Sequence, residues 1–169
     1  MATVTAPNRS FIAWLFLAGG VLQVVGAIVG LAAAGNSGAI YAISNIAIGV
    51  AFVLMFAWLA TSTLVRVAYF IAALGWLLLA LTSLINLGPV GSVAIYVAIV
   101  GSVFAGVVVL SGRPFTGRAD ILFFVAMLLG AVELLMAQNG NVPAIVETVV
   151  VVVFGAVLAV AAIFIVRRR

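Results

Sequence analysis

Long apolar stretches, separated by short polar breaks, make up most of the chain. A helix needs about 20 apolar residues to cross a hydrocarbon core of about 30 Å. Strands of a membrane barrel would alternate apolar and polar residues over about ten positions, and these stretches do not. The pattern therefore predicts six transmembrane helices. We expect them over residues 11–34, 39–60, 67–87, 89–110, 121–137 and 143–166.

The composition supports an integral membrane protein and excludes most soluble classes. Charged residues make up 6% of the chain, against about 25% in a soluble domain. So little charge cannot cover a water-facing surface, which argues against a soluble enzyme, a nucleic-acid binder or a disordered chain. We expect an all-α, single transmembrane domain over residues 1–169, whose main partner is the lipid bilayer.

The placement of basic residues predicts the orientation in the membrane. All seven are arginines, and they lie before the first predicted helix, in the second and fourth connections, and after the sixth helix. The other three connections contain no charged residue. Because basic residues concentrate in cytoplasmic segments, we expect both termini in the cytoplasm.

The odd-numbered helices align without gaps at a period of 55 residues. Two sets of residues coincide at this period: Gly20, Gly75 and Gly130, and the aromatics Trp14, Tyr69 and Phe124. Alignment of several positions in one register favours duplication over chance. We therefore expect three tandem helical hairpins, over residues 11–60, 66–115 and 121–169, as internal repeats.

With these hairpins the chain resembles the HdeD-like (DUF308) membrane proteins of bacteria. The resemblance is strongest over residues 127–135 and in the matching segments around Gly20 and Gly75. It implies a bacterial inner-membrane protein without enzymatic activity, linked to acid or envelope stress. It transfers no site residue to this chain. A weaker resemblance, over residues 19–23, connects the chain to urea/amide channels and acetate/succinate permeases.

Two alternative functions stay open. The chain could be a small-solute transporter or channel, or the substrate-binding membrane subunit of an importer. It could instead be a structural subunit of a larger membrane complex, or form a homo-oligomer. Pairs of small residues four positions apart, such as Gly26 with Gly30 and Gly155 with Ala159, fit close helix packing within one chain or between chains.

Two glutamates inside predicted helices form a candidate proton-responsive pair. Glu133 and Glu147 are each seven residues from Gly140, so an antiparallel hairpin places them at similar depth. If they face the same side, two close carboxylates in a low dielectric cannot both ionise easily. The alternative is that each reaches water or headgroups at the interface. Which side each faces cannot be fixed from one sequence.

Amide side chains suggest a candidate polar pocket formed by Gln23, Asn45 and Asn86, which the two glutamates could join. Apart from Gln23, near mid-span, these residues belong to the outer half of the predicted bundle, so the pattern favours an outward-open pocket over a continuous channel. Without His and Cys, no Ser-His-Asp triad or ordinary zinc site can form. We expect no catalytic residue, no metal and no cofactor.

Overall fold

A computed structural model describes residues 6–33, 37–85, 88–115 and 117–167, which form six α-helices. They are α1 (Ala6–Ala33), α2 (Gly38–Trp58), α3 (Thr63–Leu84), α4 (Pro89–Gly112), α5 (Arg118–Asn139) and α6 (Ala144–Arg167). Each is long and apolar enough to cross a membrane. The protein is therefore an all-α, multi-pass membrane protein. The predicted stretches differ from these helices only at their ends.

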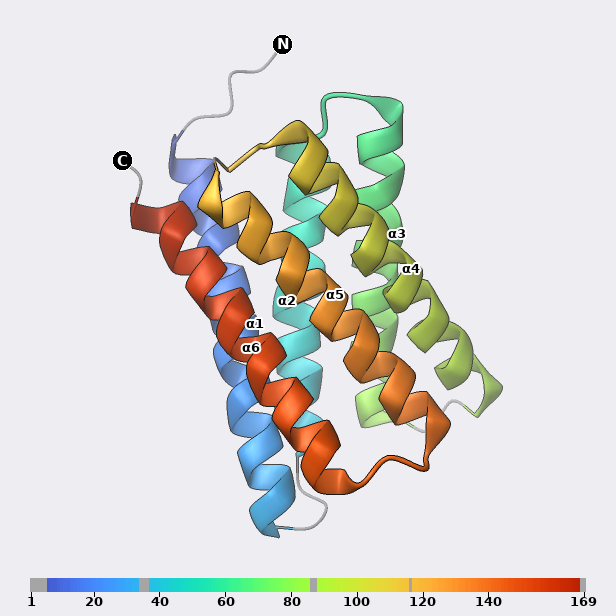
Figure 1. Ribbon diagram of the computed structural model, residues 1–169. Helices are drawn as coiled ribbons and strands as arrows, with labels where there is room; N and C mark the ends of the chain where they lie inside the picture. Colours follow the sequence, from blue (N-terminus) through green and yellow to red (C-terminus); the bar gives the residue numbers. More distant parts are fainter. Residues whose placement is uncertain (1–5, 34–36, 86–87, 116, 168–169) are drawn as a thin grey trace.

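The six helices form a closed ring in chain order. Each helix packs against its two sequence neighbours, and α6 returns to pack against α1. The helices run up and down, so the start of α1, the end of α6 and the α2–α3 and α4–α5 connections share one end (Figure 1). We call this the terminal end, and the opposite end, where the three hairpins turn, the hairpin end.

Every described arginine lies at the terminal end. Arg9 is near the start of α1, Arg66 is near the start of α3, and Arg167 ends α6. Arg113 is the C-cap of α4 and Arg118 is the first residue of α5. Arg168 and Arg169 lie outside the described residues. The hairpin end thus carries no arginine among the residues that the structure describes.

Two pairs of helices approach closely at small residues. Gly75 on α3 faces Ala98 on α4, and Gly101 on α4 faces Ala72 on α3. Likewise, a Cβ on Gly155 of α6 would lie 2.5 Å from the Gly20 carbonyl oxygen of α1. Such contacts bring backbones together where lipid offers no hydrophobic driving force, so van der Waals packing stabilises the bundle.

Three phenylalanine side chains fill the centre of the helix bundle in the half nearer the terminal end. Phe16 of α1 and Phe123 of α5 meet edge to face, with their ring centroids 5.0 Å apart. Phe52 of α2 contacts both, at centroid distances of 5.4 and 6.0 Å. All three side chains are fully buried. Because these rings reach across the bundle, they close its centre and leave the hairpin end as the place for a cavity.

Candidate functional site

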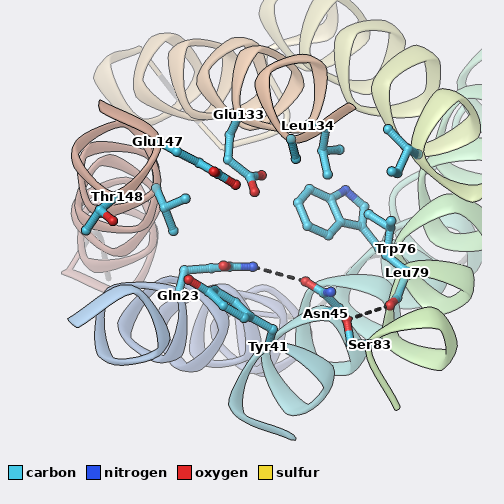
Figure 2. A pocket seen from close by; sticks show the side chains of 13 residues that line it. Gln23, Tyr41, Asn45, Trp76, Leu79, Ser83, Glu133, Leu134, Glu147 and Thr148 are labelled. Carbon is cyan, nitrogen blue, oxygen red and sulfur yellow. Dashed lines mark hydrogen bonds between the residues drawn. The ribbon is translucent and has the colours of Figure 1, made fainter. Parts of the chain in front are cut away.

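A cavity of about 280 Å³ lies inside the ring in the half nearer the hairpin end. All six helices contribute side chains to it, and Figure 2 draws them as sticks. The lining residues are Gln23, Tyr41, Asn45, Trp76, Leu79, Ser83, Ile95, Glu133, Leu134, Ala137, Glu147, Thr148 and Val151. Its size suits a small solute rather than a drug-sized molecule, which needs a pocket of about 300–1,000 Å³.

One wall of the cavity is a pair of buried amides. The Gln23 Nε2 group on α1 donates a hydrogen bond of 3.0 Å to Asn45 Oδ1 on α2. The two side chains are only 3% and 7% exposed. Within the described part of the chain, the Gln23 Oε1 and Asn45 Nδ2 atoms have no hydrogen-bond partner. Since neither atom is an enclosed, unsatisfied group, both are open to the cavity.

Other polar groups near the amides satisfy backbone carbonyls instead. The Ser44 hydroxyl donates to the Gly19 carbonyl across the α1–α2 contact, at 2.9 Å. Thr82 and Ser83 both donate to the Leu79 carbonyl of their own helix. Of the polar residues on α2 and α3, Asn45 is therefore the one that binds Gln23.

Tyr41 extends the same wall, and a glycine makes room for it. A Cβ on Gly26 would lie 3.0 Å from Cε1 of the Tyr41 ring. The Tyr41 side chain, half-buried, lies beside Gln23 at the cavity (Figure 2). The Gly26–Gly30 pair therefore does not bring two helices together: Gly26 accommodates Tyr41, and Gly30 faces Ser37.

The two glutamates enter the cavity from adjacent helices. Glu133 lies on α5 and Glu147 in the first turn of α6, and both are half-buried. Figure 2 shows their carboxylates pointing toward one another inside the cavity. The connection between the helices turns at Gly140, which has a positive φ of 62°. Glu147 also benefits from the positive end of the α6 dipole.

The charged side chains that line the cavity are all acidic. Among the residues that line it, the other ionisable group besides the two glutamates is the Tyr41 phenol. The described arginines lie at the terminal end, on the far side of the aromatic rings. No described cation is therefore placed to neutralise the two carboxylates.

Trp76 forms the floor of the cavity. Its indole stacks on Phe154 of α6, with centroids 5.8 Å apart and planes inclined by 20°. Its Nε1–H donates a 3.0 Å hydrogen bond to Ser102 Oγ on α4. With its nitrogen bonded to Ser102 and one face on Phe154, the indole is only 1% exposed and closes the cavity at this side.

The buried carboxylate of Asp120 has a structural place that the sequence analysis missed. It lies in the first turn of α5 and is 1% exposed. Its Oδ1 accepts a hydrogen bond of 3.0 Å from the Phe115 amide. This bond fixes Phe115 against Phe123, whose ring centroid is 5.8 Å away. A lone acid three residues after Gly117 is a recognisable helix-start signal.

The sequence-predicted site residues are thus mostly together. Gln23, Asn45, Glu133 and Glu147 all line the cavity, whereas Asn86 lies outside the described residues. Their functional roles stay predictions. Within the described ranges, no three potential ligands among His, Cys, Asp and Glu gather as a metal site.

No protein-family model, no curated protein and no solved structure matches the chain.

Proposed function

We propose that the chain is a non-enzymatic protein of the bacterial inner membrane whose cavity responds to acid on the periplasmic side. The convergence of Glu133 and Glu147 in one cavity, with no described cation beside them, supports this proposal. Two such carboxylates repel each other in a medium of low dielectric, so a proton taken up by either relieves the repulsion. An acid-dependent change in α5–α6 packing would then be the signal.

This role agrees with the resemblance to the HdeD-like proteins, which implies acid or envelope stress and three repeated hairpins. The buried faces of α2 and α6 support the repeat: Ile48, Ala51 and Met55 have buried counterparts at Leu158, Ala161 and Ile165, 110 residues later. In α4 the register is less regular, because Leu110, at the position matching Met55, is exposed. Gly20 packs against α6, whereas Gly75 and Gly130 contact their own hairpin partners.

Infrared titration of the carboxyl stretch tests the proton response. In the wild-type protein we expect the two glutamates to titrate in two separated steps, because the charge on one affects the other. Glu133→Gln and Glu147→Gln should each leave a single step at a new position. Thr148→Val, which alters the cavity without removing a carboxylate, should keep both steps. After subtraction of the Glu133→Gln/Glu147→Gln double variant, which retains Asp120, a wild-type curve equal to the sum of the two single-variant curves would contradict the proposal.

The proposed orientation can be tested with cysteines placed in the Cys-free chain. Substitutions at Ser37, Gly91 and Asn139, at the hairpin end, should react with a membrane-impermeant thiol reagent added to intact spheroplasts. Thr63→Cys and Gly112→Cys, at the terminal end, should react only after the membrane is opened. The reverse pattern would place the cavity on the cytoplasmic side.

A second candidate function is binding of a small solute, as a transporter or as the membrane subunit of an importer. The cavity itself, with its volume of about 280 Å³, favours this function. The aromatic rings that fill the terminal half argue for a pocket with one opening rather than a continuous pore.

A further inference from the structure

The side chains around the cavity differ in chemistry from one wall to the next. Glu133 and Glu147 supply carboxylate oxygens on one side, and Trp76 lines the cavity from α3 (Figure 2). Leu79, Leu134 and Val151 add apolar surface between these groups. A ligand that matches the cavity therefore needs a positively charged end and an apolar body.

The amide wall gives an independent indication of a ligand. Gln23 and Asn45 are both more than nine-tenths buried, yet each keeps one polar atom unpaired toward the cavity. Neither atom is enclosed, so both are accessible to a molecule in the cavity. The free Gln23 Oε1 atom is an acceptor, which suits an N–H donor on the ligand.

We infer that this cavity binds a small organic ammonium ion, with its charged group at Glu133, Glu147 and Gln23 Oε1 and its apolar body against the apolar side chains of the lining. Charge-assisted hydrogen bonds to carboxylates are stronger than neutral ones.

Other ligand classes fit the same walls less well. An anion would meet two carboxylates without a described cation to compensate. A calcium ion takes six to eight oxygen ligands, and the aromatic and aliphatic side of the cavity supplies none. A neutral solute would leave the negative charge of the carboxylates uncompensated.

The inference uses the same two carboxylates as the proposed proton response, but it goes beyond that function. Proton uptake needs the carboxylates to interact with one another. Cation binding needs them to face the amide wall and the apolar lining of the cavity. The two proposals can therefore fail separately. Separated titration steps without ammonium binding would contradict only this inference. Ammonium binding by glutamates that titrate independently would contradict only the proposed function.

Binding can be measured by fluorescence and calorimetry on the full chain in lipid nanodiscs. The chain has three tryptophans, so a Trp14→Phe/Trp58→Phe background leaves Trp76 as the reporter. n-Butylammonium chloride should change the Trp76 emission saturably at neutral pH. n-Butanol, which has nearly the same shape without the charge, should not. Sodium chloride at equal ionic strength corrects for screening.

Variants at the carboxylates distinguish a specific binding site from unspecific partition of the ammonium ion into the protein or the lipid. Glu133→Gln and Glu147→Gln should each weaken n-butylammonium binding by about tenfold or more, as loss of one charge-assisted bond implies. Glu133→Asp should retain part of the affinity. Thr148→Val should bind within about twofold of the wild type, because the Thr148 hydroxyl is already bonded to the Ala144 carbonyl and is not needed by the ligand.

Three outcomes would overturn the inference. Equal responses to n-butanol and n-butylammonium would indicate adventitious partition only. Equal competition by sodium or potassium ions would indicate an inorganic cation site. Unchanged affinity in the Glu133→Gln/Glu147→Gln double variant would place binding elsewhere. If the variants do not fold, acidification of the wild-type protein serves instead: affinity should fall as the carboxylates take up protons, and a constant affinity would contradict the site.

Discussion

Replacing Gly75 by alanine should lower the free energy of unfolding by about 2–3 kcal/mol, the upper part of the range for overpacking. A Cβ at this position would lie 2.5 Å from the Ala98 backbone nitrogen. Backbone atoms of a neighbouring helix cannot rotate away as the end of a side chain can, so α3 and α4 must separate. Denaturation in mixed micelles, followed by circular dichroism, measures the loss.

The same crossing offers a reciprocal variant and a control. Gly101→Ala should cost a similar amount, because its Cβ would lie 2.5 Å from the Ala72 Cα atom. Gly91→Ala, also on α4, would meet nothing nearer than Thr82 Cγ2 at 3.9 Å. It should be neutral or stabilising by up to about 1 kcal/mol, since alanine is the better helix former. Equal effects at Gly75 and Gly91 would contradict the close α3–α4 crossing.

Phe123→Ala should be the most damaging change among the central rings, with an expected loss of about 2 kcal/mol or more. Phe123 contacts Phe16, Phe52 and Phe115 at centroid distances of 5.0 to 6.0 Å. In a membrane the unfolded helices stay in lipid, so the transfer term is small and the cost comes from the cavity left behind. The same variant should also join the hairpin-end cavity to the terminal end.

Two measurements check these effects. Denaturation in mixed micelles gives the stability loss, with Phe11→Ala as control because the Phe11 side chain is 53% exposed and leaves no internal cavity. Release of a small fluorescent cation from proteoliposomes gives the leak. A tight, fully stable Phe123→Ala protein would show that these rings do not close the bundle.

The number and limits of the helices could be predicted because lipid leaves the backbone few choices. Every span must satisfy its own hydrogen bonds, so length and hydropathy decide where helices form. The errors lie at the ends. α1 begins at Ala6, and α5 extends over Arg118–Asn139, because polar residues continue a helix into the interface once its apolar part is formed.

The direction in which each helix faces could not be predicted. All six helices are apolar on every side, so the sequence contains no clear periodic pattern that would indicate which face of each helix is buried. Gly20 and Gly75 share a position in the proposed repeat, yet they face α6 and α4 respectively. The sequence analysis places Gln23 and Asn45 in one candidate pocket, but the hydrogen bond between them depends on helix rotation, which the sequence does not reveal.

Trp76 shows the same limit more clearly. Its position near the middle of α3 had no explanation in an interfacial belt of aromatic residues, where indoles lie at headgroup level. Its role follows from two residues far away in the sequence, Phe154 beneath its ring and Ser102 at its nitrogen. These contacts form only when the six helices close into a ring, and no local sequence pattern encodes that closure.

That closure also has a consequence for how the protein is made. The seam between α1 and α6 joins helices that leave the ribosome at different times, with four other helices between them. Until α6 is inserted, the face of α1 around Gly20 can be covered only by lipid or by an assisting protein. Assembly of the cavity therefore cannot be completed during translation of the first five helices. A chain stalled before α6 would present an open crescent to the insertion and quality-control machinery of the membrane.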